Sequence, residues 1–152
     1  MKGYTYRPQS GRSVARARGH ELPMSPKKSY EVLNAIRGLS VERARQVLEE
    51  ARDLKRAIPF RRYNQETAHH KGVGPGRYAK KVVVQVLQVL ANAEANAEYE
   101  GLDTDRLYIH TASAARGRIQ KARMPRAQGR ATAWNEQTTH IELVLAETKE
   151  DA

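Results

Sequence analysis

Apolar positions recur every three to four residues in three segments of the chain, which predicts three amphipathic helices. The expected helices cover residues 26–37, 40–57 and 80–100. Ser25 is the expected N-cap of the first helix, and Pro59 is expected to end the second. The expected buried stripes are Tyr30, Val32, Leu33 and Ile36; Val41, Ala44, Val47, Leu48, Ala51 and Leu54; and Val83, Val86, Leu87, Leu90 and Ala97.

Apolar and polar residues alternate in two later segments, 107–113 and 138–147, as they do in half-buried strands. Residues 14–22 are also expected to be extended. One face of each strand can cover the helices. The sequence therefore predicts an α+β fold, with three helices packed on a small three-stranded antiparallel sheet. Residues 58–78 break all periodicity and are expected to form a long polar loop.

Residues 107–135 contain no acidic side chain, and both flanks of this stretch are expected strands. The cations in it are Arg116, Arg118, Lys121, Arg123, Arg126 and Arg130. We expect an extended β-hairpin over about residues 113–133, and a disordered basic loop is the alternative. From Arg106 to a tip near Met124 one arm would reach roughly 60 Å, against a diameter of roughly 35 Å for the globular part. The distal half has little apolar area, so an outside partner is expected to order it.

The 152 residues suit a single domain, with a globular part of about residues 14–112 and 134–147, a flexible N-terminus and an acidic C-terminal tail. The net charge of +10 favours polyanions, with nucleic acid ahead of an anionic membrane. No apolar run approaches the ~18 residues of a membrane span. The N-terminus lacks the apolar stretch of a secretory signal, and cysteine is absent. We therefore expect a cytoplasmic protein.

Cations alternate with aromatic residues in two further places, residues 60–64 and 76–81. Such a mixture can hold phosphates with its cations and stack bases on its rings, and arginine adds planar, multidentate phosphate contacts. Phe60 is open to a second interpretation as a core residue. Trp134, which adjoins the hairpin, is open in the same way to a core position or a stacking role.

Nothing in the sequence indicates catalysis or a cofactor. His69 and His70 are adjacent and face different ways, so solvated histidines are expected rather than a metal site. The motif GVGPG follows no strand and lacks the Lys-Ser or Lys-Thr ending of a nucleotide-binding loop, so it is expected to be a turn. No serine has a nucleophile context, and no carboxylate pair lies in an apolar setting. We expect no enzyme activity and no small-molecule substrate.

The segment RMPRAQGRATAWNEQTTHIELVL, residues 123–145, resembles the tip and return strand of large ribosomal subunit protein family twenty-two. This is the universal family whose extended hairpin lines the peptide exit tunnel. The segment VLANAEANAEYEGLDTDRLYI resembles the family's third helix, and IPFRRYN and GPGRYAKK resemble the insertion of its archaeal and eukaryotic branch. The resemblance implies a globular domain near the tunnel exit, with residues 121–130 at a hairpin tip that reaches inward.

The resemblance also implies contacts with several domains of the large-subunit (23S-type) rRNA, with neighbouring ribosomal proteins and with the nascent polypeptide. The residues expected to contact RNA are Arg16, Arg18, Lys27, Lys28, Arg61, Arg62, Tyr63, Asn64, Arg77, Tyr78, Lys80, Lys81, Asn92, Asn96, Arg116, Arg118, Lys121, Arg123, Met124, Pro125, Arg126, Gln128, Gly129, Arg130 and Trp134. The alternatives are a free-standing RNA- or DNA-binding regulator and an RNA-processing enzyme. The enzyme would need His69, His70 or Glu66 for its chemistry.

Overall fold

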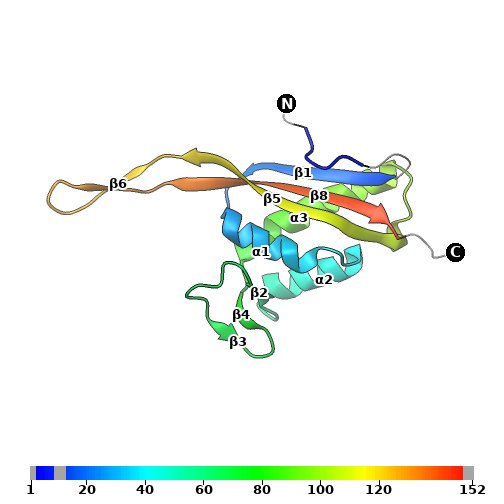
Figure 1. Ribbon diagram of the computed structural model, residues 1–152, viewed down its shortest axis with the longest axis horizontal. Coiled ribbons are helices and arrows are strands. Elements are labelled where there is room, and N and C mark those ends of the chain that lie inside the picture. The colour runs from blue at the N-terminus through cyan, green and yellow to red at the C-terminus, as the bar shows by residue number, and fades with distance from the viewer. Residues whose placement is uncertain (1–2, 9–12, 149–152) are drawn as a thin grey trace.

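The computed structural model describes residues 3–8 and 13–148, and within them the chain has the α+β fold expected from the sequence. A three-stranded antiparallel sheet carries the helices on one face, and two of its strands continue as a long hairpin (Figure 1). The expected flexible start and acidic tail fall partly on residues 1–2, 9–12 and 149–152, which lie outside the described ranges. No helix of the described part is long and apolar enough to span a membrane.

In chain order the described elements are β1 (Val14–Leu22), α1 (Pro26–Ile36), α2 (Val41–Arg52), β2 (Ile58–Pro59), β3 (His69–His70), β4 (Gly74–Arg77), α3 (Lys80–Tyr99), the 3-10 helix η1 (Thr104–Arg106), β5 (Leu107–Gln120), β6 (Arg123–Pro125), β7 (Ala131–Ala133) and β8 (Glu136–Glu147). Strand β8 is the centre of the main sheet, with β1 on one side and β5 on the other. Strand β1 ends opposite Thr139, whereas β5 and β8 stay paired out to Gln120 and Glu136. The short strands β6 and β7 continue the same two arms, so the hairpin is continuous with the sheet.

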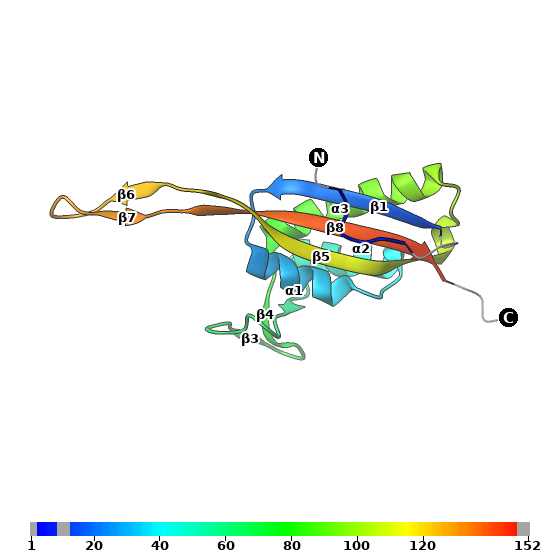
Figure 2. The same cartoon turned by 45° about the horizontal axis from the view of Figure 1, so that its top comes forward.

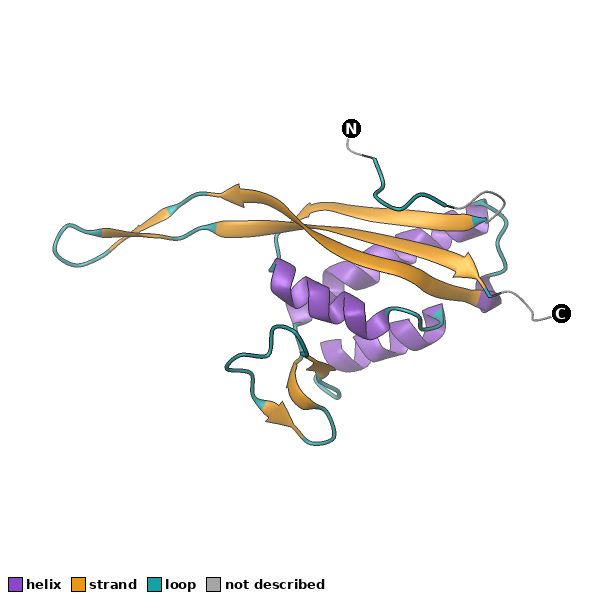
Figure 3. Ribbon diagram, viewed as in Figure 1, coloured by secondary structure: helices purple, strands orange, loops and turns teal. Residues whose placement is uncertain are grey.

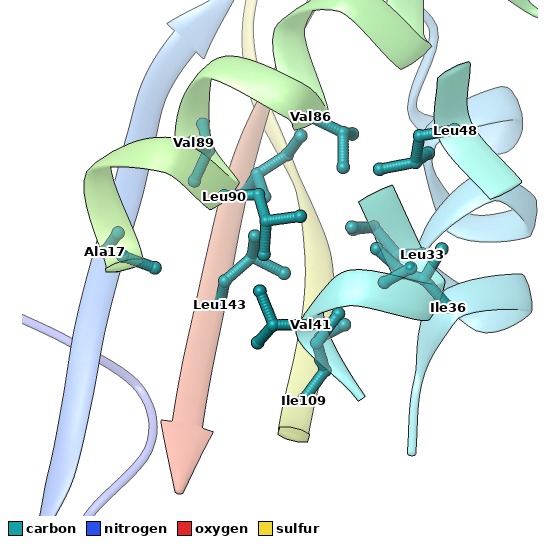
Figure 4. Packing of buried hydrophobic residues seen from close by; sticks show 14 of the residues in the cluster. Ala17, Leu33, Ile36, Val41, Leu48, Val86, Val89, Leu90, Ile109 and Leu143 are labelled. Carbon is teal, nitrogen blue, oxygen red and sulfur yellow. The ribbon is translucent and has the colours of Figure 1, made fainter. Parts of the chain in front are cut away.

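The helices and the sheet enclose one apolar core (Figure 4). Helices α1 and α3 pack on the sheet, and α2 packs against α3. Leu33, Leu90 and Leu143 are almost fully buried in this core. Val47 and Leu87, both expected in the core, are only partly buried. Tyr30, also expected in the first stripe, is likewise only partly buried.

Helix α2 ends at Arg52. It is therefore shorter than the expected helix, which continued to residue 57 and was to be ended by Pro59. The backbone of Leu54 takes a left-handed φ of 63° just after the helix, and the N–H of Lys55 returns to the carbonyl of Glu50. This left-handed turn closes the helix before the proline is reached. It also turns Leu54 toward solvent, so its expected place on the buried stripe is wrong.

Residues 58–78, here called the insertion, form a small antiparallel sheet in the order β2-β4-β3 and not the long loop that was expected (Figure 3). The last three residues of GVGPG belong to β4, so the expectation that this motif is only a turn was also wrong. A Cβ at Gly76 would lie 3.0 Å from the carbonyl oxygen of Ile58, so glycine lets the two strands approach. Phe60 is buried and therefore belongs to the core.

The outer face of the main sheet is crossed by residues 3–8, on the side opposite the helices (Figure 2). The N–H groups of Thr5 and Tyr6 both donate to the carboxylate of Glu142, at 2.9 Å each. Glu142 and Val144 are buried, although they alternate with the core residues of β8. These contacts hold a part of the N-terminal segment that was expected to be flexible.

The hairpin turns at Gln128 and Gly129, whose φ values are 60° and 65°. The turn lies within residues 121–130, the tip implied by the resemblance, but beyond Met124, from which the arm length was estimated. The N–H of Arg126 donates to the carbonyl of Arg130 at 2.8 Å and closes the turn. Two irregularities in the pairing of β5 with β8 each add a residue to the β5 arm, which moves the turn toward the C-terminus. The arm beyond the sheet is exposed along nearly its whole length.

Shortening the hairpin is therefore expected to leave the free domain stable. We would replace residues 121–135 by Asn-Gly, a dipeptide suited to a two-residue turn between the paired Gln120 and Glu136. The change in unfolding free energy is expected to stay within about 0.5 kcal/mol, because the removed residues lie outside the core. Urea unfolding measures this, with Leu143→Ala as a core control that should cost about 2–5 kcal/mol. A loss for the truncated chain as large as that of the control would contradict the expectation.

Candidate nucleic-acid interface

Four side chains at the junction of α1 and the insertion form a cation–aromatic cluster: Lys27, Tyr30, Arg62 and Tyr63. The Arg62 guanidinium carbon lies 5.2 Å from the ring centre of Tyr30 and 5.4 Å from that of Tyr63. The Lys27 ammonium lies 5.7 Å from the Tyr63 ring. The two rings meet edge to face with their centres 5.8 Å apart. These are distances at which a cation is attracted to an aromatic face.

A buried carboxylate fixes the backbone of this cluster. Glu31 of α1 is only 1% exposed, and it accepts three hydrogen bonds from the insertion. The donors are the N–H groups of Arg61, Arg62 and Tyr63, at 3.2, 2.8 and 2.7 Å. A buried carboxylate needs such partners, because the desolvation of an unpaired charge is costly. The charge of Glu31 therefore holds the insertion against α1.

A pocket of about 440 Å³ opens beside the cluster. It is lined by Ser25, Lys27, Lys28, Phe60, Arg62, Tyr63, Gln65, Glu66 and Arg77. Four of these residues are cations and one is an acid, so the lining is positive. Arg77 donates from Nη2 to the carbonyl of Glu66 at 3.3 Å, which joins two parts of the insertion. Small-molecule sites have volumes of about 300–1,000 Å³.

The same basic surface continues to the base of the hairpin. A second pocket, of about 490 Å³, brings Lys28 of α1 and Lys81 of α3 together with Gln120, Asn135 and one acid, Glu136, at the hairpin arms. Neither α1 nor α3 has an acidic residue in its first turn. The positive ends of two helices and their lysines therefore add to one another beside the hairpin. Three other expected RNA contacts are sequence neighbours of pocket-lining residues: Lys80 adjoins Lys81, Asn64 adjoins Tyr63, and Tyr78 adjoins Arg77. The ring of Tyr78 packs edge-on against His70.

The hairpin cations expected from the sequence are all exposed: Arg116, Arg118, Lys121, Arg123, Arg126 and Arg130. No salt bridge of the described residues involves any of them. Arg126 donates from Nε to the Thr132 hydroxyl at 3.2 Å, across the arms. Trp134 is 52% exposed, which excludes the core position that was one interpretation of it. Met124 is half-buried, Pro125 ends β6, and Gln128 and Gly129 make the turn.

Three other residues expected to contact RNA hold parts of the protein together. Asn96 donates from Nδ2 to the carbonyl of Arg16 at 2.9 Å and so ties α3 to β1. The Arg16 guanidinium lies 4.8 Å from the ring centre of Tyr4. Arg18 donates from Nη1 to the carbonyl of Gly3 at 3.0 Å. Asn92 is exposed on α3, one turn before Asn96. The structure therefore gives Arg16, Arg18 and Asn96 roles that sequence patterns did not indicate.

Acidic side chains gather on a different part of the molecule. A groove of about 460 Å³ between α2, α3 and η1 is lined by Glu42, Glu49, Glu94, Glu98 and Asp105, among others. Arg45 forms a salt bridge with Glu94, and this hydrogen bond raises the pKa of the Arg45 guanidinium. A polyanion is repelled from such a groove. The charge distribution therefore separates a basic interface from an acidic face.

Two histidines and a glutamate that the sequence analysis did not group lie at the base of the hairpin. His20, Glu21 and His140 offer ligand atoms within 4.8 Å of one another. The N–H of Glu21 donates to Nδ1 of His140 at 3.0 Å, across 119 positions of sequence. A neutral His140 then carries its proton on Nε2 and has no free lone pair. We therefore assign no metal to this cluster. His69 and His70 form β3, apart from it.

The chain matches one known protein family over most of its length. The family described as ribosomal protein L22p/L17e matches residues 17–146. The chain belongs to this family, whose members are structural and non-enzymatic ribosomal proteins. It is 46% identical to large ribosomal subunit protein uL22 of Archaeoglobus fulgidus, over 93% of each chain. The identity to the uL22 of Methanothrix thermoacetophila is 49%, over 89% of this chain and 91% of the relative. The resemblance drawn from the sequence is thereby confirmed.

Glu31→Gln is expected to loosen the insertion. The amide cannot accept from three N–H groups as the carboxylate does, and hydrogen bonds to charged groups contribute about 1.5–3 kcal/mol. We expect a loss of roughly that size in urea unfolding, with faster amide exchange at Arg61, Arg62 and Tyr63. Glu98→Gln, at an exposed site on α3, is the control and should change stability by less than about 0.5 kcal/mol. Equal stability of the two variants would show that the Glu31 charge does not hold the insertion.

Proposed function

We propose that the chain is a structural constituent of the large ribosomal subunit that binds large-subunit rRNA. In this proposal the globular domain lies near the polypeptide exit and the hairpin lines the exit tunnel. The observation that carries it is the hairpin itself. It is paired and continuous with the core sheet at its base, yet beyond Gln120 it presents exposed cations and small side chains. The names of the relatives, large ribosomal subunit protein uL22, support the same assignment.

The energetics of the hairpin argue for a partner outside the chain. A two-stranded ribbon has marginal stability in water when it lacks a packed face. Here the distal arms hold arginines whose charges repel one another and meet no carboxylate among the described residues. RNA phosphates would remove that repulsion, and alanine and glycine let the backbone approach closely. The tip around Gln128 and Gly129 is then the part available to a nascent polypeptide.

Charge also gives the globular part an orientation. The insertion, the N-termini of α1 and α3 and the base of the hairpin would face rRNA. The acidic groove between α2, α3 and η1 would face away from it, toward solvent or neighbouring ribosomal proteins. The proposed RNA contacts of the globular part include residues that line the two basic pockets: Lys27, Lys28, Arg62, Tyr63, Arg77 and Lys81. They also include the sequence neighbours of these residues: Arg61, Asn64, Tyr78 and Lys80.

Sedimentation tests the proposal directly. The full chain should pellet with large ribosomal subunits and remain with them after a high-salt wash. It should be absent from small subunits run in parallel. A chain that stays in the supernatant, or follows free RNA or DNA equally well, would instead be a free-standing nucleic-acid-binding regulator.

The salt dependence of rRNA binding measures how many cations take part. With about eight phosphate contacts, log K should fall against log salt with a slope of roughly −6 to −7. The truncated hairpin described above lacks four cations, Lys121, Arg123, Arg126 and Arg130, and its slope should be shallower by roughly 3. Filter binding of both proteins over a salt series gives the two slopes. Equal slopes would mean that the distal cations do not meet phosphates.

A further inference from the structure

Arg62 differs from the other cations of the interface in how firmly it is held. Among the described residues it is the one cation that lies over two aromatic rings, those of Tyr30 and Tyr63. Its backbone N–H donates to Glu31 at 2.8 Å. The side chain is nevertheless exposed, and no salt bridge of the described residues uses it. The backbone of Arg62 and its guanidinium are therefore both held in place, while the guanidinium forms no salt bridge in the described part.

A fixed and exposed guanidinium is a surface for stacking. The group is planar and weakly hydrated, and it stacks on nucleic-acid bases. Two rings already hold it in place, so less side-chain entropy is lost when a ligand lies on it. A lysine at the same place would carry the same charge but no plane. This geometry suits a base better than it suits a phosphate alone.

The neighbouring pocket supplies cations that can bind the phosphate of a nucleotide whose base lies on Arg62. Lys28 and Arg77 line it together with Arg62, and these cations can hold a phosphate. Arg77 is steadied by its bond to the carbonyl of Glu66. A base within a duplex has neighbours on both faces and cannot enter, whereas a bulged or single-stranded base can.

We infer that this pocket binds one unstacked nucleotide of RNA, with its base on the guanidinium of Arg62 and its phosphate near Lys28 and Arg77. The inference rests on the proposed function, because it takes rRNA as the ligand. It adds that the contact at the insertion reads the shape of RNA and does not only neutralise charge. Glu31 is then a positioning residue, which acts through the backbone of Arg62 and touches no RNA.

Two RNA duplexes test the inference, identical except that one carries a single bulged adenosine. Stacking of one base on a protein platform is strong enough to favour the bulged duplex by roughly tenfold. Arg62→Lys keeps the charge and should keep the salt slope, but it should reduce the preference to less than about twofold. Arg43→Lys is the matched control, since Arg43 is exposed on α2, lies outside this pocket, covers no ring in the described part and is not among the proposed RNA contacts. It should keep the preference.

Tyr63 gives an independent variant. Tyr63→Phe retains a ring under Arg62 and should retain the preference, whereas Tyr63→Ala should lose most of it. Indifference of the unmodified protein to the bulge would overturn the inference, as would an Arg62→Lys variant that still prefers the bulged duplex. Either result leaves the proposed function standing if the chain still pellets with large subunits. Failure to bind either duplex and failure to pellet would overturn both.

Discussion

The antiparallel pairing of β5 with β8 is the interaction on which the rest of the structure depends. Near its base the ladder is covered by helices, and residues such as Ile109 and Leu143 are fully buried. Past the end of β1 the same ladder continues into solvent without a covered face. The packed base of the ladder therefore sets the direction of the hairpin arm, which has no packed face of its own. Backbone hydrogen bonds, and not side-chain packing, extend this order outward.

Two buried carboxylates have a related role in the globular part. Glu31 accepts from three backbone N–H groups of the insertion, and Glu142 accepts from two of the N-terminal segment. Each acid lies on a core element and holds a segment rich in cations or aromatic rings. A chain with a net charge of +10 thus uses internal anions to shape two segments, one of which, the insertion, is proposed to bind RNA. Preorganisation of this kind lowers the entropic cost of binding.

Periodicity was enough to predict the three helices and the strands of the main sheet, because each of these elements is long and has a buried face. The hairpin was predicted instead from the acid-free stretch between two expected strands, since its distal arms are exposed. Periodicity failed for the insertion, whose strands are two to four residues long and include Gly-Pro-Gly, a sequence that normally interrupts strands. The arm-length estimate placed the tip near Met124, short of the turn at Gln128 and Gly129, because bulges in β5 leave no mark in the hydrophobic pattern.

The sequence was enough to predict which cations belong to the candidate site. It was not enough to predict which side chains and backbone groups they contact. Glu31 and Glu142 occupy positions that alternation or helical spacing would assign to solvent. Each is buried only because a segment remote in sequence crosses it. The cluster of Tyr30 with Arg62 and Tyr63 was missed because its members are remote in sequence. Tyr30 had also been assigned to the buried stripe of its helix.

The exposed arm also has a consequence for the free chain. Both edges of a two-stranded ribbon present unpaired N–H and C=O groups, which can recruit another strand and start aggregation. The arginines and Lys121 along the arms oppose that pairing by repulsion, and Pro125 opposes it because it lacks an N–H donor. The charges proposed to meet RNA after assembly therefore also keep newly made copies apart before assembly.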